Sequence, residues 1–359
     1  MTLEGLGWNS FFAESIQNYK ESGLIRGRIV KRINDNYIIN DGLNELHAKL
    51  TGKFRYQANQ SKDFPAIGDW VVFEIKENSQ FGFIHAVLPR KSYFSRKLAI
   101  SGGRKIKRGI LEGGKTEEQV IAANIDTVFI VCGLDGDFDL RRIERYLTLA
   151  YNSGATPVIL LNKLDVCSRV EERIEQVKSV AVGVPFFPIS AEKDINMSVI
   201  YSFLTIGQSI AFLGSSGVGK STITNALLGI DKQRKQEVSK ATGKGKHTTT
   251  SAELIQHSSG SVIIDTPGLR EVQLWGDEEV LEESFRDITS LISQCKYSNC
   301  CHQSEPECAI KKAIEDRNIS ESRFESYLKQ SDELQRLNHK IKNLEVQLNK
   351  RRKKNLREG

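Results

Sequence analysis

Residues 214–222, GSSGVGKST, constrain the fold of this chain more than any other stretch. They match G-x-x-x-x-G-K-[ST], a glycine-rich loop whose backbone N–H groups surround the phosphates of a nucleotide. The loop follows the apolar run SIAFLG and precedes a helix expected to begin near Gly219. This strand, loop and helix context predicts a nucleotide-binding α/β domain.

The phosphate loop and a separate acidic motif, DTPG, are both expected to bind the phosphates of the nucleotide and their Mg²⁺. Lys220 is expected to reach the β- and γ-phosphates, and Ser221 to ligate Mg²⁺. Asp265, in DTPG after the apolar run SVIID, is expected to hold Mg²⁺ through water, and Gly268 to sense the γ-phosphate. The nucleotide contacts expected in the phosphate loop are Gly214, Ser215, Ser216, Gly217, Val218, Gly219, Lys220, Ser221 and Thr222.

A base-reading motif lies upstream, not downstream, of the phosphate loop. The residues Asn162, Lys163, Leu164 and Asp165 follow the apolar run PVILL and resemble the guanine-reading tetrapeptide of GTPases. The aspartate would accept hydrogen bonds from guanine N1–H and the 2-amino group, a donor pair that adenine lacks. Lys163 would lie along the base, and Asn162 would brace neighbouring loops. Ser190 and Ala191 follow the next apolar run, where a turn would offer a backbone N–H to guanine O6.

The segment 240–250, KATGKGKHTTT, is expected to respond to the γ-phosphate. One of its three final threonines should contact Mg²⁺ when GTP is bound, and Thr249 is preferred. Leu269 stands where many GTPases carry the glutamine that orients the attacking water, so slow intrinsic hydrolysis is expected. His247 is the candidate replacement, and a bystander surface histidine is the alternative. The expected catalytic residues are therefore Lys220, Thr249 and His247.

Four of the six cysteines fall within residues 295–308. In a cytosolic chain such clustering favours a metal over disulfides. Three thiolates and one imidazole complete a tetrahedral structural zinc shell, and the expected ligands are Cys295, Cys300, His302 and Cys308. Cys301 is interpreted as a spare. The alternative is a helical hairpin with unmetallated cysteines.

The pattern of strands and helices predicts a multidomain α/β protein. Five short strands favour an N-terminal five-stranded OB-type β-barrel, whose usual ligand is nucleic acid. Alternating apolar strands and amphipathic helices then favour a P-loop domain with a parallel sheet and helices on both faces. A helical zinc-binding domain follows, ending in a helix with leucines at heptad spacing. The expected segments are an N-terminal extension (1–23), the barrel (24–95), a basic linker (96–118), the nucleotide domain (119–277) and the C-terminal domain (278–359).

The charge and hydropathy of the chain indicate which kinds of partner it can bind. The chain carries 51 Lys and Arg against 45 Asp and Glu, with basic clusters within residues 90–108 and 350–357. Such clusters suit a polyanion, with ordinary solvated surface as the alternative. In the barrel, Phe54, Arg55 and Tyr56 either contact RNA or pack in the core. No apolar run reaches the roughly 20 residues that span a bilayer, so a cytoplasmic protein with no membrane partner is expected.

The motif order is guanine tetrapeptide, serine–alanine turn, phosphate loop and Asp-Thr-Pro-Gly, a rotation of the usual order. With the flanking barrel and cysteine cluster, it resembles the circularly permuted GTPases of the ribosome small subunit-dependent GTPase A family over roughly residues 24–310. The resemblance implies binding of GTP and GDP, one zinc ion, Mg²⁺, a barrel that contacts ribosomal RNA, and GTP hydrolysis stimulated by the small ribosomal subunit late in its maturation. A monomer is expected.

Two alternatives to this function stay open. One is a GTP-gated RNA-binding assembly factor in which hydrolysis is incidental. Leu269 supports this alternative, because leucine cannot orient the attacking water. The other is a translation-factor-like GTPase acting on mature ribosomes.

Overall fold

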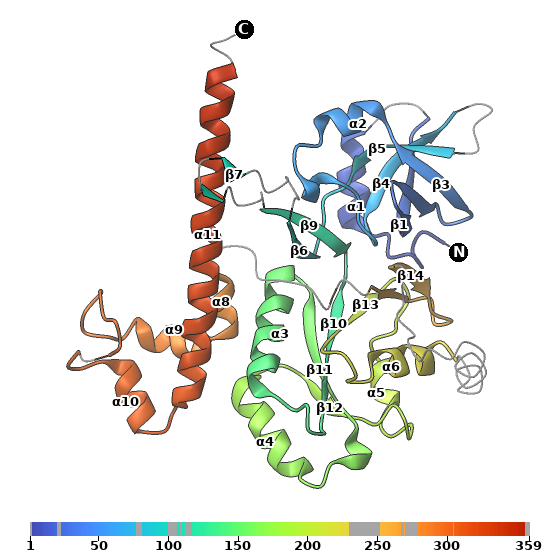
Figure 1. Cartoon of the computed structure of the whole chain (residues 1–359). Helices are drawn as coiled ribbons and strands as arrows, with labels where there is room; N and C mark the ends of the chain where they lie inside the picture. Colours follow the sequence, from blue (N-terminus) through green and yellow to red (C-terminus); the bar gives the residue numbers. More distant parts are fainter. Residues whose placement is uncertain are drawn as a thin grey trace. The chain divides into compact units, whose positions relative to one another are not determined.

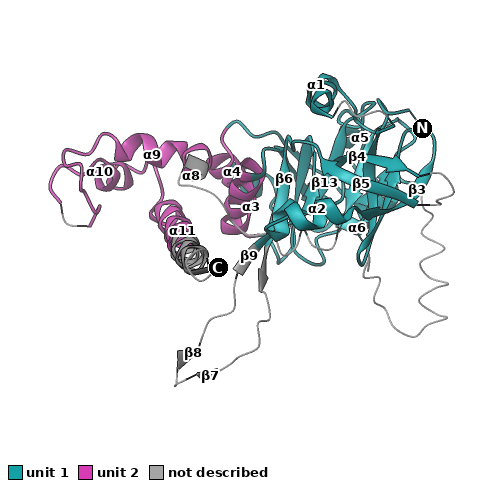
Figure 2. Ribbon diagram, turned by 90° about the horizontal axis from the view of Figure 1, so that it is seen from above, with its two compact units in different colours: residues 1–138, 153–175, 183–273 teal, residues 139–152, 176–182, 274–359 magenta. Residues whose placement is uncertain are grey.

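The computed structural model describes residues 2–19, 23–76, 81–99, 106–107, 110–111, 116–229, 252–266, 269, 279–303 and 305–355. The chain folds into two compact units, coloured separately in Figure 2. Unit 1 comprises residues 1–138, 153–175 and 183–273, and unit 2 comprises residues 139–152, 176–182 and 274–359. The five segments expected from the sequence divide the chain differently, and their boundaries stay a prediction.

Unit 1 contains a closed β-barrel (Figure 1). Its strands are β1 (Ile25–Ile33), β2 (Asn36–Asn40), β3 (Glu45–Leu50), β4 (Trp70–Ile75) and β5 (Phe81–Val87). They pair in the order β1-β2-β3-β5-β4, and β4 pairs back with β1, which closes the barrel. Only the β3–β5 pairing is parallel among these. The expected five-stranded barrel is confirmed.

Between β3 and β4 the chain forms helix α2 (Gly52–Gln57) and the 3-10 turn η2 (Ser61–Asp63). Thr51 begins α2 by accepting a hydrogen bond from the Phe54 N–H. The Phe54 ring is buried and packs edge-on against Phe64. Tyr56 on the same helix is 91% exposed. Phe54 is therefore a core residue, whereas Tyr56 is open to solvent.

After the barrel, β6 (Tyr93–Ala99) pairs antiparallel with β9 (Thr116–Ala123), and β7 (Ile106–Lys107) pairs with β8 (Ile110–Leu111). The sequence predicts a basic linker over residues 96–118. The structure instead extends β6 and β9 into both ends of that segment. Strands β6 and β9 pair through their backbone hydrogen bonds, which do not need an alternating pattern of apolar side chains. These strands are therefore not detectable from such a pattern.

The other strands of unit 1 form a mainly parallel sheet. They are β10 (Thr127–Gly133), β11 (Thr156–Asn162), β12 (Phe186–Pro188), β13 (Ser209–Leu213), β14 (Glu253–Gln256) and β15 (Val262–Asp265). Their order is β12-β11-β10-β13-β15-β14, with only β14 antiparallel to its neighbour β15. Helices α5 (Ser198–Tyr201) and α6 (Lys220–Leu227) share a core with this sheet that includes Phe129, Ile200 and Ile223.

The barrel and the parallel sheet are joined into one sheet of 11 strands, because β14 also pairs with β1. The register places Lys31 opposite Glu253, and their side chains form an ion pair of 2.9 Å. This pairing of β14 with β1 cannot be predicted from the sequence, because the residue pattern of a strand does not specify which other strand it pairs with.

The N-terminal segment folds onto the barrel through α1 (Ser10–Ser15) and the 3-10 turn η1 (Ile16–Asn18). The Trp70 ring meets those of Trp8 and Phe12 at centroid distances of 4.8 and 5.7 Å. Beneath these rings the Arg28 side chain is only 1% exposed, and its guanidinium donates to Leu6 O, Gly68 O, Asn124 O and Ser209 Oγ. Burial lowers the pKa of Arg28 to about 10, which still leaves the group charged at neutral pH.

Unit 2 is helical. Its elements are α3 (Leu140–Ser153), α8 (Glu279–Ser284), α9 (Arg286–Ile292), α10 (Ala309–Glu315) and α11 (Glu321–Asn355), while α4 (Val170–Val180) is shared between the units. The buried Arg323 of α11 donates to Glu144 of α3 at 2.9 Å and to both carboxylate oxygens of Asp287 at 3.0 and 2.9 Å. Among the described helices, none has the length and apolar character to cross a bilayer.

Candidate active site and metal centre

The expected nucleotide motifs meet at one edge of the parallel sheet. The base-reading tetrapeptide begins at the end of β11, the phosphate loop follows β13, and Asp265 ends β15. Strands β11, β10, β13 and β15 are consecutive neighbours and all parallel. The carboxyl ends of parallel strands share an edge, and ligands of such sheets bind there. The topology therefore gathers the motifs although their order along the chain is rotated.

Asn162 connects three of these motifs directly. Its side-chain Nδ2 donates to Val218 O in the phosphate loop at 2.8 Å. Its Oδ1 accepts from the Ala191 N–H of the serine–alanine turn at 3.0 Å. The side chain is 3% exposed, so both bonds are shielded from water. Asn162 thus braces the phosphate loop and the serine–alanine turn against the tetrapeptide.

The phosphate loop has the geometry of an anion cradle leading into α6. Lys220 Nζ donates to Gly214 O at 2.7 Å and also to Ser215 O, which holds the ammonium over the loop. Gly219 has φ +102°, and a Cβ there would lie 2.1 Å from Asn162 Nδ2. Only glycine fits this approach. The loop can therefore close against Asn162 while its amides face a phosphate group.

The residues expected to hold Mg²⁺ offer oxygen ligands of the kind this ion prefers. Ser221 lies in the first turn of α6 and is exposed. Asp265 ends β15, the neighbour of the phosphate-loop strand β13, and is partly exposed. A hydroxyl and a carboxylate at one edge of the sheet fit a magnesium ion bound together with nucleotide phosphates.

On the base side, Asp165 is exposed at the turn η3 (Leu164–Val166), and its Oδ1 accepts from Ser190 Oγ at 2.6 Å. Ser190 Oγ also accepts from the Lys193 N–H at 3.2 Å, which fixes the turn. The Ala191 N–H is already donated to Asn162, so another amide of this turn must serve guanine O6, or Ala191 must exchange its partner. A backbone N–H of this turn is expected from the sequence to be open to guanine O6, and the Ala191 N–H is not.

The structure adds two acidic residues that the sequence patterns did not single out. Asp135 and Asp137 lie in the loop after β10, whose sequence is GLDGDFD over residues 133–139. Asp135 Oδ2 lies 2.5 Å from Lys163 Nζ, and Asp137 Oδ2 accepts from Ser215 Oγ at 2.7 Å. Their position directly after a buried strand could have identified these two residues from the sequence, because the loops of neighbouring parallel strands meet there.

Three of the expected site residues, His247, Thr249 and Gly268, lie outside the described residues. Leu269, in the position expected for a water-orienting glutamine, is described and is 3% exposed. Its N–H donates to Thr266 O at 3.3 Å. A buried leucine has no group that could orient a water molecule.

The candidate metal centre lies in unit 2. The ligand atoms of Cys295, Cys300, His302 and Cys308 all fall within 4.8 Å of one another. His302 Nδ1 lies 3.6 Å from Cys295 Sγ and 3.4 Å from Cys308 Sγ, so Nδ1 is the nitrogen that faces the thiols. Burial lowers the pKa of His302, which favours the neutral imidazole that binds metals.

The donor set of this centre, three sulfurs and one nitrogen, suits zinc. Cys301 is exposed, and its Sγ points to Asn299 O at 3.7 Å instead of joining the cluster. His302 also packs edge-on against Phe324 of α11, with ring centroids 5.7 Å apart. A metal held here would therefore fix the loops beside α9 and α10 next to α11.

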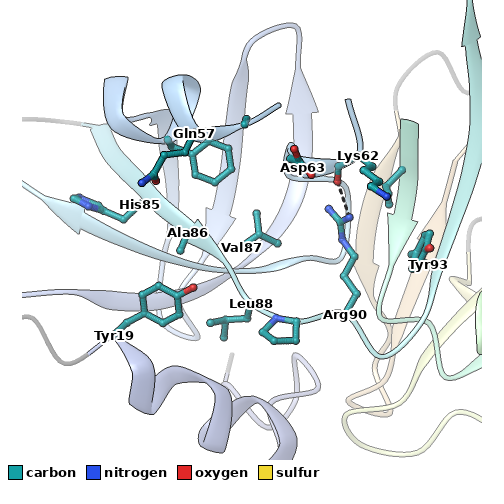
Figure 3. Close-up of a pocket in the computed structure, with 14 residues that line it drawn as sticks. Tyr19, Gln57, Lys62, Asp63, His85, Ala86, Val87, Leu88, Arg90 and Tyr93 are labelled. Carbon is teal, nitrogen blue, oxygen red and sulfur yellow. Dashed lines mark hydrogen bonds between the residues drawn. The ribbon is translucent and has the colours of Figure 1, made fainter. Parts of the chain in front are cut away.

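The barrel carries a cavity of about 660 Å³, shown in Figure 3. Tyr19, His85 and Tyr93 line it, together with Lys62 and Arg90. The Arg90 guanidinium donates to both carboxylate oxygens of Asp69 at 2.8 and 2.7 Å, and Lys62 lies 3.9 Å from a Glu118 oxygen. Both of these cations therefore have a carboxylate partner, which is close for Arg90 and more distant for Lys62.

Comparison with known proteins agrees with this site. A family model described as RsgA GTPase matches residues 103–275, and one described as 50S ribosome-binding GTPase matches residues 209–348. The small ribosomal subunit biogenesis GTPase RsgA of Syntrophotalea carbinolica is 39% identical over 335 residues, which cover 93% of this chain and 90% of that protein.

Solved structures show the same fold. YjeQ from Thermotoga maritima matches with a TM-score of 0.62 and 27% identity, covering 87% of this chain and 98% of that one. YloQ, described as a circularly permuted GTPase, matches in fold with a TM-score of 0.59 at 22% identity, covering 88% and 97%. With these identities and coverages, the chain belongs to the RsgA family of circularly permuted GTPases and is a GTP-hydrolysing enzyme.

Proposed function

We propose that this GTPase acts in the cytoplasm as a monomer in late maturation of the small ribosomal subunit, binding its RNA and hydrolysing GTP when the subunit stimulates it. Hydrolysis then releases the factor. The name of the relative from Syntrophotalea carbinolica supports the process. The observation that carries the proposal is the pair of Asn162 bonds, because they join the base-reading and phosphate-binding motifs into one pocket for GTP.

The residue roles follow from this pocket. Asp165 reads the guanine edge with the support of Ser190, and Lys163 lies along the base. Lys220 binds the β- and γ-phosphates, and the amides of Gly214 to Thr222 bind their oxygens. Ser221, Asp265 and Thr249 would hold Mg²⁺, which would supply positive charge to offset the negative charge that develops on the phosphates. Gly268 would sense the γ-phosphate.

The chain itself supplies little to position the attacking water. Leu269 is buried and apolar, so intrinsic hydrolysis is proposed to be slow. His247 is the proposed water-orienting residue, brought into place when the small subunit binds. The N-terminal barrel and its exposed Tyr56 are proposed to contact ribosomal RNA. The zinc centre would stabilise unit 2.

The test is phosphate release from GTP by the full chain, with and without purified small subunits. Many-fold stimulation by small subunits, and none by large subunits, is expected. A Lys220→Ala variant controls for contaminating GTPases and should release no phosphate under either condition. His247→Ala should lose most of the stimulation and keep GTP binding. Equal turnover with and without subunits would contradict the proposal.

One alternative function is supported by a specific observation. The buried Leu269 leaves the described part of the site without a water-orienting group at that position, which suits a GTP-gated RNA-binding assembly factor whose hydrolysis is incidental. In that case a variant that binds GTP without hydrolysing it would still leave matured subunits normally. A factor that depends on hydrolysis would instead stay bound to them.

A further inference from the structure

The loop after β10 lies between the two halves of the nucleotide site. Strand β10 pairs with β11 on one side, register Gly133 to Asn162, and with β13 on the other, register Ile130 to Leu213. The loop that follows β10 therefore leaves the sheet between the base-reading tetrapeptide and the phosphate loop. Its main chain is anchored there, since the Leu134 N–H donates to Asn162 O at 2.8 Å.

Within this loop, Asp135 holds the ammonium of Lys163. Asp135 Oδ2 and Lys163 Nζ are 2.5 Å apart, and the two side chains are 32% and 30% exposed. Lys163 has a left-handed backbone, with φ 68° and ψ 36°. A lysine is uncommon in this conformation, which aims its side chain in a direction that an ordinary backbone would not give. The ion pair then fixes the far end of a long and otherwise mobile side chain.

The surroundings of Asp135 are fitted to this contact. Asp135 Oδ1 accepts from the Asp137 N–H at 3.3 Å, so the carboxylate is held from both sides. A Cβ at Gly133 would lie 2.5 Å from Asp135 Oδ1 and 3.7 Å from Lys163 Cδ. Glycine at this position thus permits the carboxylate and the lysine stem to approach the sheet edge together. Lys163 favours the charged carboxylate and lowers the pKa of Asp135.

We infer that Asp135 is a positioning residue for guanine nucleotides, which acts by holding Lys163 extended along the plane where the purine binds. A lysine already fixed in this position loses less conformational freedom when the base arrives, so its contact contributes more to affinity. The inference rests on the proposed role of Lys163 in base reading. The neighbouring Asp137 makes its contact with the phosphate loop through Ser215, so the same loop touches both ends of the site.

The chain offers a closely matched control within the same loop. Asp139 accepts from the Arg141 N–H at 2.9 Å at the start of α3 and lies 3.8 Å from Arg142 Nη2, and both of these partners belong to α3, not to the nucleotide motifs. Asparagine caps helices as well as aspartate does. An Asp139→Asn variant therefore removes one charge from the loop without removing the helix cap, whereas Asp135→Asn removes the charge that holds Lys163.

The test is a double-mutant cycle on the full chain, using the equilibrium dissociation constant of GDP so that hydrolysis does not interfere. Asp135→Asn is expected to weaken GDP binding about tenfold, the effect of losing one charge-assisted hydrogen bond. The same factor should apply to a non-hydrolysable GTP analogue, because the contact is with the base. Lys163→Met should weaken binding at least as much, and the double variant should bind no more weakly than Lys163→Met alone. Asp139→Asn should bind as the wild type does.

The cycle separates positioning from a general structural role. If Asp135 only supported the loop, Asp135→Asn would weaken binding by the same factor in the Lys163→Met background, and that result would overturn the inference. Wild-type affinity in the Asp135→Asn variant would also overturn it. Failure of the wild-type chain to bind GDP would overturn the proposed function itself. Thermal unfolding of each variant confirms that the comparison is made between folded proteins.

Discussion

The Arg28 guanidinium donates to the Ser209 hydroxyl at 2.9 Å, although 181 positions separate the two residues in the sequence. Arg28 belongs to barrel strand β1, and Ser209 begins β13, the strand that leads into the phosphate loop. The Ser209 N–H in turn donates to Asp126 Oδ2 at 2.8 Å, just before β10. The barrel is thus tied to the start of the phosphate-loop strand by a buried hydrogen bond.

Replacing Arg28 by methionine should destabilise unit 1 strongly. The substitution removes the arginine donor from the buried carbonyl oxygens of Leu6 and Asn124, at a cost of about 1–3 kcal/mol for each unsatisfied group. Chemical unfolding followed by tryptophan fluorescence would measure the change. The control is Arg26→Met on the same strand, whose exposed guanidinium lies 5.1 Å from the centroid of the Trp8 ring, and its loss should change stability by no more than about 1 kcal/mol. Equal effects of the two substitutions would show that the buried bonds contribute little.

Asp165→Asn should exchange the base preference of the site. The asparagine amide donates where the carboxylate accepts, so it suits a purine with a carbonyl at position 2 instead of an amino group. We expect GTP affinity to fall by roughly 100-fold or more and xanthosine triphosphate to bind better than GTP. Competition binding with both nucleotides measures this. Ser190→Ala, which removes only the bond to Asp165 Oδ1, should cost less and keep the guanine preference.

Cys308→Ala should abolish binding of the structural metal. Its thiol lies 3.4 Å from His302 Nδ1 within the four-residue cluster, so the substitution leaves three ligands. Zinc analysis of purified protein should give close to one ion per wild-type chain and much less in the variant, with a lower thermal midpoint. Cys301→Ala is the matched control, because the exposed Cys301 thiol points away from the cluster and its loss should leave the zinc content unchanged.

Glu144→Gln should destabilise unit 2. The Glu144 side chain has no exposed surface, and its partner Arg323 is 6% exposed, so the variant leaves a buried cation short of its counter-charge. Breaking a buried pair from one side costs about 3–5 kcal/mol, and the remaining pairing of Arg323 with Asp287 places the expectation near the lower value. Glu283→Gln, which disrupts the exposed pair with Arg286, should change the free energy of unfolding by less than about 1 kcal/mol. Hydrogen exchange in α11 would report where the loss occurs.

The parts of this molecule that were predictable have strong local patterns. The five barrel strands, the phosphate loop and the spacing of Cys295 to Cys308 all follow from residues close in sequence. The β14–β1 junction and the Arg28 bonds were not predictable, because they join segments whose own patterns do not specify a partner. Asp135 was missed for a related reason, since its role depends on Lys163 arriving from the next strand.

Unit 2 is built from segments far apart in the sequence, and this has a consequence for mutations that truncate the chain. Unit 2 takes α3 from the middle of the sequence and its partners Arg323 and Glu333 from the end. A premature stop codon after residue 273 would spare every nucleotide motif and yet remove both of these contacts from α3. Glu144 would keep its neighbour Arg141 but lose its arginine from α11. Shortened products of that kind should fold poorly and be degraded readily by cellular proteases, even though they would contain all the nucleotide motifs.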